Sequence, residues 1–292
     1  MILACVILNY NDSETTISLI NRIKNFSVFD YLVIVDNCST DQSYEHLKRF
    51  SSDRIIVLNT PRNGGYGYGN NYGIYYSYYE LESDYTLIVN PDVEFDESTV
   101  HSLLKIMEQN KDCAISSCKP VNRNKKMDFA RKYTNGLHDV LSASLIMNRC
   151  IGARYYSEDY FKGQEICDVY EVPGSFLLVK TPLMVKYGLY DEEFFLFEEE
   201  KVLAHKMTQN ELKTLLSLKN EYIHNHSVSI SKSYKSSVER KRLLLNSKYT
   251  FIKKYRKFNG IQLFMARIFF KYAIFEMYLY SKYLEYRKIL SN

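Results

Sequence analysis

The sequence has no tryptophan and few residues that interrupt regular structure, with 11 glycines and 5 prolines among 292 residues. This scarcity excludes collagen-like and low-complexity chains, and 46% hydrophobic with 25% charged residues is the composition of a globular protein. The six cysteines include no C-x-x-C pair, and no signal peptide is recognisable. We therefore expect reduced cysteines in a cytoplasmic protein, without disulfides or a zinc site.

Charge is distributed unevenly along the chain. Residues 231–292 contain 15 Lys and Arg against 3 Asp and Glu, a balance of +12, whereas residues 1–230 have a balance of −8. Such an asymmetry indicates an anionic partner at the basic end, either a membrane surface or a nucleic acid. We therefore expect one large domain at residues 1–230 and a basic amphipathic helical tail at residues 231–292.

The longest apolar run of the tail is residues 261–280. Arg267, Lys271 and Glu276 interrupt it, so it is shorter than the about 18–20 uncharged residues of a membrane span. A basic helix rich in Phe, Leu and Tyr instead suits the membrane interface. The alternative is a helix packed on the body with its basic side chains in water, and the charge balance favours membrane contact.

Strands alternate with helices in the first half of the chain. Unbroken apolar runs at residues 2–8, 31–35, 54–58 and 85–89 predict strands that are buried on both faces, and residues 70–80 are typical of a helix. This alternation predicts an open, mostly parallel α/β sheet.

Residues 110–230 are less regular. Strands are predicted at residues 114–116 and 174–179, and the polar stretch at residues 119–132 is expected to be a mobile loop. In residues 189–200 aromatic side chains meet carboxylates directly before a predicted helix.

Polar residues follow each of the four early strands. Ligands of such sheets bind beyond the carboxyl ends of the strands, so Asn11, Asp36, Asn63 and Asp92 should gather at one edge. Any one of them alone is as well explained as a turn former or helix cap. Four at successive strand ends favour a binding site.

The glycine-rich segment of residues 64–73 matches no nucleotide-binding motif. It lacks the Lys-Ser/Thr of a P-loop, and Asn70 and Tyr72 stand where the two frames of G-x-G-x-x-G need a glycine. A dinucleotide fold for hydride transfer is disfavoured, whereas a backbone passing close to a ligand is still compatible.

Asp92 is the best candidate for a metal ligand, because a hard divalent ion takes one or two carboxylates together with phosphate oxygens. Glu199 and Glu200 are the best candidates for a general base. The nearby phenylalanines at 194, 195 and 197 would desolvate these carboxylates and raise their pKa. A solvated acidic helix start, favoured by the helix dipole, is the alternative. His224 and His226 are either ligands or ordinary strand residues.

Several motifs in series support a family resemblance. They are V-D-N-x-S-T-D at residues 35–41, N-x-G at 63–65, N-x-G-I at 71–74, N-P-D at 90–92, P-G-S-F at 173–176 and F-F-L-F-x-E-E at 194–200. Their order and spacing over residues 1–230 resemble family 2 glycosyltransferases, and within them the bacterial rhamnosyltransferase-type branch. The resemblance implies the GT-A fold, a Rossmann-like mostly parallel sheet flanked by helices, here with a C-terminal helical extension. It also implies a nucleotide-sugar donor and inversion at the anomeric carbon.

The resemblance assigns roles to individual residues. Tyr10 and Asp36 would hold the nucleoside, Asp92 would bind Mg²⁺ or Mn²⁺ on the diphosphate, and Glu200 stands where the family has its catalytic Asp, with Glu199 beside it. His224, with Ser229, matches a later His…Ser signature and would reach the diphosphate or the metal. The further expected substrate-binding residues are Asn11, Asn63, Asn71 and Asn90.

The catalytic motif departs from the family pattern Glu-Asp-x-Asp. Glu200 retains a carboxylate but lengthens its reach by one methylene, Val202 removes a second acid, and Lys206 replaces an Arg. These changes are also compatible with a catalytically silent subunit that binds the sugar nucleotide as the partner of another glycosyltransferase.

The predicted function is therefore metal-dependent, inverting transfer of rhamnose or a hexose from a nucleoside diphosphate to a hydroxyl of a growing, lipid-linked bacterial capsule or cell-wall polysaccharide. The protein would act in the cytoplasm at the inner face of the cell membrane, in peripheral contact through its tail and without nucleic acid. Besides the silent subunit, a nucleic-acid-binding protein using the basic tail and a nucleotidyltransferase are the competing hypotheses.

Overall fold

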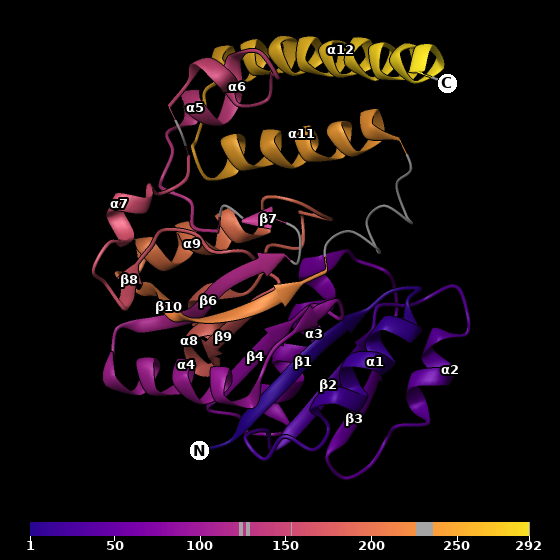
Figure 1. Ribbon diagram of the computed structural model, residues 1–292, viewed down its shortest axis with the longest axis vertical. Helices are drawn as coiled ribbons and strands as arrows, with labels where there is room; N and C mark the ends of the chain where they lie inside the picture. The colour runs from indigo at the N-terminus through magenta and orange to yellow at the C-terminus, as the bar shows by residue number, and fades with distance from the viewer. Residues whose placement is uncertain (123–124, 127–128, 153, 226–235, 292) are drawn as a thin grey trace. The chain divides into compact units, whose positions relative to one another are not determined.

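The computed structural model describes residues 1–292 except 123–124, 127–128, 153, 226–235 and 292 (Figure 1). Its elements in chain order are β1 Leu3–Asn9, α1 Ser13–Ile23, β2 Tyr31–Asp36, α2 Ser43–Lys48, β3 Ile55–Asn59, α3 Tyr66–Tyr79, β4 Tyr85–Val89, β5 Val93–Glu94, α4 Glu97–Gln109, β6 Cys113–Asn122, β7 Lys125–Lys126, α5 Gly136–Leu141, α6 Met147–Cys150, α7 Glu158–Phe161, β8 Ile166–Asp168, β9 Phe176–Lys180, α8 Thr181–Leu183, the π-helical turn η1 Met184–Gly188, α9 Glu199–Gln209, β10 Lys213–His224, α11 Ser237–Lys254 and α12 Gly260–Ser291.

The chain divides into two compact units. The first consists of residues 1–132, 155–195 and 199–229, and the second of residues 133–154, 196–198 and 230–292. The short segment 196–198 therefore belongs to the second unit, although its neighbours on both sides belong to the first. The predicted division of the chain into a domain at residues 1–230 and a tail at residues 231–292 stays a prediction.

The first unit is built on one sheet with the strand order β3-β2-β1-β4-β9-β6-β10-β5. Strands β1 to β4 are parallel to one another, and β10 is parallel to β6. β9 is antiparallel to both β4 and β6. The predicted α/β sheet, mostly parallel, is thus present, and Figure 1 shows β1, β2 and β3 side by side.

Both faces of this sheet are covered, which explains why its strands are apolar without alternation. Along β1, Leu3, Cys5 and Ile7 join a core cluster with residues of α1 and α4. The alternate residues Ala4 and Val6 form a second cluster with β2 and a tyrosine of α3 on the opposite face. The unbroken apolar sequence of the strand therefore agrees with the cover on both faces of the sheet.

Part of the polar stretch at residues 119–132, expected to be a mobile loop, is sheet: residues 119–122 belong to β6, and residues 125–126 form β7. β6 extends to residue 122, because Lys119, Pro120 and Val121 pair with Glu221, Tyr222 and Ile223 of β10. β7 pairs with the end of β6. The expectation was wrong for these residues, because pairing with a strand a hundred positions away outweighs their local polarity.

The second unit is helical, as the tail sequence predicts. Helices α11 and α12 run alongside each other in this unit (Figure 1), and Phe251, Ala266, Phe270 and Ala273 are buried there. Among the helices that the structure describes, none has an apolar stretch long enough to cross a membrane.

Candidate active site

The carboxyl ends of the parallel strands meet at one edge of the sheet in the first unit. Residues Asn9 of β1 and Asp36 of β2 are register partners at this edge, and β4 ends beside Phe176, where antiparallel β9 begins. β10 ends at His224, paired with Val93 of β5. This topology brings strand-end residues from distant parts of the sequence to the same edge.

Asp36 lies in a dense polar network at the end of β2. Its Oδ1 accepts hydrogen bonds from Asn9 Nδ2 at 2.7 Å and Ser39 Oγ at 2.6 Å, and its Oδ2 accepts one from Ser39 N at 2.9 Å. The residue is 1% exposed. Since a carboxylate has about four acceptor positions, most of the capacity of Asp36 holds the turn after β2 in place.

Tyr10 and Asn11 follow β1 beside this turn. Asn11 has a positive φ of 51°, a conformation that Asn tolerates better than most residues. Its side-chain Oδ1 accepts a hydrogen bond from Thr40 N at 2.8 Å, and its backbone N donates to Ser39 Oγ at 2.9 Å. Tyr10 is half-buried. The predicted nucleoside-binding residues Tyr10 and Asp36 therefore belong to neighbouring turns.

Asn63 connects the turn after β2 to the start of α3. Its Oδ1 accepts hydrogen bonds from Asn37 Nδ2 and from Gly65 N, both at 3.1 Å. Asn37 Nδ2 also donates to Gly65 O at 3.0 Å. Gly65 has a φ of 91°, and a Cβ there would lie 2.2 Å from the carbonyl oxygen of Phe195, so only glycine fits.

Tyr66 links α3 to the ends of β4 and β9. Its hydroxyl lies 2.8 Å from Gly174 O and 3.2 Å from Asn90 Oδ1, sharing its one proton between these acceptors. Gly174 N in turn lies 3.3 Å from Glu200 Oε1. Polar contacts thus run continuously from Asn63 to the candidate base. Sequence reasoning had assigned no role to Tyr66.

Asp92 and His224 form a pair at the same edge. Asp92 Oδ1 lies 3.3 Å from His224 Nε2, and the two side chains are 13% and 10% exposed. The backbone of Asp92 also accepts a hydrogen bond from Asn225 N at 3.0 Å. The expected metal ligand and the expected diphosphate-contacting histidine are therefore brought together. His226 and Ser229 lie outside the described residues.

Glu200 occupies a desolvated position at the start of α9. Burial raises the pKa of its carboxyl group above the ordinary glutamate value, the positive charge of Arg131 lowers it, and the negative charge of Glu171 raises it further. A cavity of about 10 Å³, room for roughly one water molecule, is lined by Glu200, Glu171 and apolar residues. The general-base expectation thus has a physical basis in this geometry.

The cavity beside Glu200 is lined mainly by apolar and aromatic side chains. Tyr170, Val172, Leu177 and Leu203 are among its lining residues, and the phenylalanines at 194, 195 and 197 are not. The preceding carboxylate, Glu199, is itself 8% exposed. The expectation that these phenylalanines desolvate the carboxylates stays a prediction.

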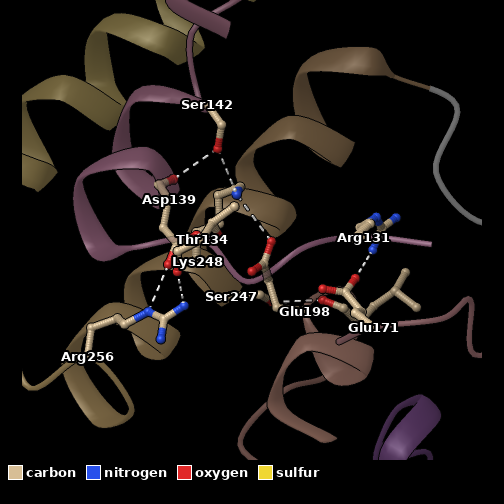
Figure 2. A network of polar contacts seen from close by, with 10 residues as sticks. Arg131, Thr134, Asp139, Ser142, Glu171, Glu198, Ser247, Lys248 and Arg256 are labelled. Carbon is tan, nitrogen blue, oxygen red and sulfur yellow. Dashed lines mark hydrogen bonds and ion pairs between the residues drawn. The ribbon is translucent and has the colours of Figure 1, made fainter. Parts of the chain in front are cut away.

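Arg131 and Glu171 are site residues that the sequence did not reveal. Their side chains form an ion pair, drawn in Figure 2, and their backbones pair as an isolated β-bridge. Glu171 is 4% exposed. The two residues lie 40 positions apart in segments without a motif, and both act on Glu200 in the folded chain.

Asn71 forms hydrogen bonds to residues 190–192. Its Nδ2 donates to Tyr190 O at 2.9 Å and to Glu192 Oε1 at 3.0 Å, and its Oδ1 accepts from Tyr190 N at 2.9 Å. The residue is 3% exposed. Because both ends of its amide group are engaged by the chain, these contacts make Asn71 a clamp between α3 and residues 190–192 and do not support a substrate contact.

The glycines of α3 serve packing. A Cβ on Gly73 would lie 2.6 Å from Val6 Cγ1 and 2.9 Å from Val35 Cγ2, on the two strands beneath the helix. A Cβ on Gly67 would lie 2.8 Å from Tyr190 Cβ. The close approach suggested by the glycine-rich sequence is therefore made to other parts of the protein.

The donor set at Asp92 suits a divalent ion that shares its coordination with a ligand. Among the described residues, no three His, Cys, Asp or Glu side chains come together as a protein-only metal site. One carboxylate and one imidazole 3.3 Å apart leave most positions to be filled by diphosphate oxygens and water, as Mg²⁺ usually requires. The residues present fit such an ion.

A surface hollow lies at the opposite edge of the sheet. It has a volume of about 440 Å³ and is lined by Met1, Asp84, Tyr85, Glu108, Lys180, Pro182 and Leu183. Tyr85 begins β4 and Lys180 ends β9, so the hollow lies away from the polar network. We assign the candidate site by the convergence of polar groups, because that is what recognises a charged ligand.

The chain has the GT-A fold. Solved structures of similar fold include GalNAc-T7 with UDP, GalNAc and Mn²⁺, with a TM-score of 0.58 and 12% identity over 77% of this chain. Another is the mannosyltransferase PcManGT of Pyrobaculum calidifontis in complex with GDP-Man and Mn²⁺, with a TM-score of 0.58 and 11% identity, covering 95% of this chain and 73% of its own. The chain spans 44% of GalNAc-T7, so that protein has further parts.

The chain belongs to glycosyl transferase family 2, whose family model matches residues 4–163. A relative is the low-salt glycan biosynthesis hexosyltransferase Agl10 of Haloferax volcanii, 26% identical over 234 residues that cover 77% of this chain and 68% of the relative. The predicted family and GT-A fold are thus confirmed. The rhamnosyltransferase-type branch stays a prediction.

Proposed function

We propose that this protein is an inverting glycosyltransferase that moves a rhamnose or hexose from a nucleoside diphosphate to a hydroxyl of a lipid-linked bacterial surface polysaccharide. The observation that carries the proposal is the gathering of Asp36, Asn90, Asp92, His224 and Glu200 at the carboxyl edge of one sheet. The relative Agl10, a hexosyltransferase, favours a hexose.

The nucleoside would bind beside the turns after β1 and β2. Asp36 keeps one acceptor position on Oδ2 after its hydrogen bonds to Asn9 and Ser39 are counted, enough to accept one hydrogen bond from a base or ribose. Tyr10, half-buried next to it, offers a ring on which a base can stack. Asn11 and Asn63 stabilise the turn after β2, Asn11 through Thr40 and Asn63 through Asn37.

The diphosphate would lie at the Asp92–His224 pair. These residues would hold a Mg²⁺ or Mn²⁺ ion, and the ion when bound neutralises charge on the leaving diphosphate. Asn90, whose Oδ1 accepts a hydrogen bond from the Tyr66 hydroxyl, would contact the same group. Two solved structures of similar fold, GalNAc-T7 and PcManGT, were each determined with Mn²⁺, and this supports a divalent ion.

Glu200 would act as the general base. A carboxylate with a raised pKa is a better proton acceptor near neutral pH than an ordinary glutamate, and such proton transfer contributes about 10²–10⁴-fold. Glu200 takes the proton of the acceptor hydroxyl as its oxygen attacks the sugar from the side opposite the diphosphate. A single displacement inverts the anomeric carbon and needs no covalent intermediate on the protein. Glu199 directly precedes it in the chain and is the second expected catalytic carboxylate.

The tail would hold the protein at the membrane. α12 exposes a long apolar and aromatic face that includes Ile261, Phe264, Ile268 and Phe275, each more than half exposed. The basic tail around this face suits anionic lipid, at about 1 kcal/mol for each Lys or Arg near the surface. Deleting residues 231–292 should lower sedimentation with anionic liposomes, and unchanged sedimentation would contradict this part of the proposal.

The decisive test combines donor binding with turnover. Nucleotide sugars with Mn²⁺ or Mg²⁺ should raise the melting temperature by mass action, and the stabilising donor should be transferred or slowly hydrolysed. Asp92→Asn and Glu200→Gln should each abolish turnover while the far-ultraviolet circular dichroism stays unchanged. A donor that stabilises the wild type without transfer or hydrolysis under any condition would instead support the silent-subunit hypothesis, to which the Glu in place of Asp at position 200 gives some weight.

A further inference from the structure

The segment that precedes the candidate base is held in a strained conformation. Phe197 and Glu198 have φ values of 71° and 66°, two consecutive non-glycine residues in the left-handed region. Such a conformation persists only where surrounding contacts impose it, and it occurs frequently at functional sites. Glu199 and Glu200 follow directly in the chain as the first residues of α9.

Two side chains of helix α11 contact this segment. Leu196–Glu198 and α11 fall in the same compact unit. Ser247 Oγ donates a hydrogen bond of 2.7 Å to Leu196 O, and Lys248 Nζ lies 3.3 Å from Glu198 Oε1 (Figure 2). Two adjacent residues of one helix thus hold both ends of a three-residue segment.

This ion pair is well shielded from water. The side chains of Lys248 and Glu198 are 5% and 9% exposed, so salt screens their attraction little. Lys248 Nζ also donates to Ser142 Oγ at 3.2 Å, which further orients it. Removing one partner of a buried ion pair leaves the other charge buried and uncompensated, which is strongly destabilising. The Lys248–Glu198 pair therefore stabilises the observed position of the segment.

We propose that Lys248, assisted by Ser247, is a positioning residue for the catalytic carboxylates, acting through Glu198. The inference rests on the proposed function of Glu200 as the base. Because Glu198 is two residues before Glu200, release of the segment would let the start of α9 shift. A displacement of about 1 Å at a reacting group can cost on the order of 10²-fold in rate.

The same unit offers a matched control. Arg256 Nε and Asp139 Oδ2 form an ion pair of 3.0 Å whose side chains are 7% and 1% exposed, also drawn in Figure 2. Arg256 is further bonded to Thr134. This pair is as buried as the first but joins the 134–139 segment, which carries no candidate catalytic group.

The experiment compares Lys248→Met, Ser247→Ala, Lys248→Arg and Arg256→Met in the full-length protein. Turnover and donor KM are measured together with hydrogen exchange of backbone amides. Lys248→Met should lower kcat by about tenfold or more with donor KM within about twofold, and Lys248→Arg should recover most of it. Ser247→Ala, a milder change, keeps the test valid if Lys248→Met folds poorly. Arg256→Met should leave kcat within about twofold of the wild type.

Hydrogen exchange separates this inference from the proposed function. Lys248→Met and Ser247→Ala should accelerate exchange in residues 196–200, whereas Arg256→Met should accelerate it in residues 134–139. Unchanged exchange at 196–200, an unchanged kcat in Lys248→Met, or an equal loss of kcat in Arg256→Met would each overturn the inference. If the wild type turns over no donor, the proposed function fails, and the exchange pattern alone decides whether α11 holds the segment.

Discussion

Replacing Glu171 by Gln should make the candidate base more acidic. Glu171 raises the pKa of Glu200 by like-charge repulsion, and the positive charge of Arg131, its ion-pair partner, lowers that pKa. The amide of Gln has the same shape but no charge. The substitution therefore removes the repulsion and keeps the charge of Arg131, and the pKa of Glu200 should fall towards the ordinary glutamate value.

The strength of this repulsion follows from burial. Glu171 is 4% exposed, so water and salt screen its repulsion of Glu200 little. We therefore expect Glu171→Gln to lower the pKa of Glu200, and at a pH below both pKa values a larger fraction of the base should be ionised. Arg131→Met should shift the pKa in the opposite direction, but it leaves Glu171 buried without its partner and risks unfolding.

The assay is the pH dependence of kcat/KM for transfer or donor hydrolysis. A base must be deprotonated, so activity rises with pH through the pKa of Glu200, and this acidic limb should move to lower pH in Glu171→Gln. Glu165→Gln is the control, because the Glu165–Lys219 pair is 67% and 65% exposed. An acidic limb at the same pH in wild type and Glu171→Gln would refute the assignment of Glu200 as the titrating base.

Three further predictions test the fold and the site without reference to transfer. Gly73→Ala should destabilise the protein by up to about 2 kcal/mol in urea unfolding, since overpacking costs about 1–3 kcal/mol and the better helix propensity of Ala offsets about 1 kcal/mol. Gly152→Ala, which meets nothing within 4 Å, should change stability little. His224→Gln should reduce the thermal shift that Mn²⁺ produces with a nucleoside diphosphate, and an undiminished shift would remove His224 from the proposed site. The raised pKa of Glu200 makes its contribution to stability complete below the ordinary glutamate pKa and lost as pH rises through the folded-state pKa. The stability of wild type relative to Glu200→Gln should therefore fall from pH 4 to pH 8, and a constant difference would contradict the raised pKa.

Much of the fold could be read from the sequence because its signals are local. An apolar run such as residues 2–8 needs cover on both faces, so it indicates a buried strand wherever it occurs. Polar residues directly after such strands must then lie at the carboxyl edge. Asp36 and Asp92 were placed at that edge correctly for this reason, and Asp92 was found beside His224.

Other features depended on contacts that no local pattern encodes. The polarity of residues 119–122 suggested a loop, yet pairing with β10 makes them a strand. Asn71 lies in a motif of the family, but its amide is engaged by the backbone of Tyr190 and the side chain of Glu192. In both places a distant partner decides the outcome.

The sequence by itself determined the layered α/β architecture, the helical tail and the candidate carboxylates, since periodicity and motif spacing depend on neighbours in the chain. Only the tertiary structure decided what surrounds Glu200. The ion pair of Arg131 and Glu171 that tunes its pKa, and the contact of Lys248 with Glu198, join segments 40 and 50 residues apart. Electrostatic effects depend on distance and burial in the folded chain, and neither distance nor burial can be read from the order of the residues.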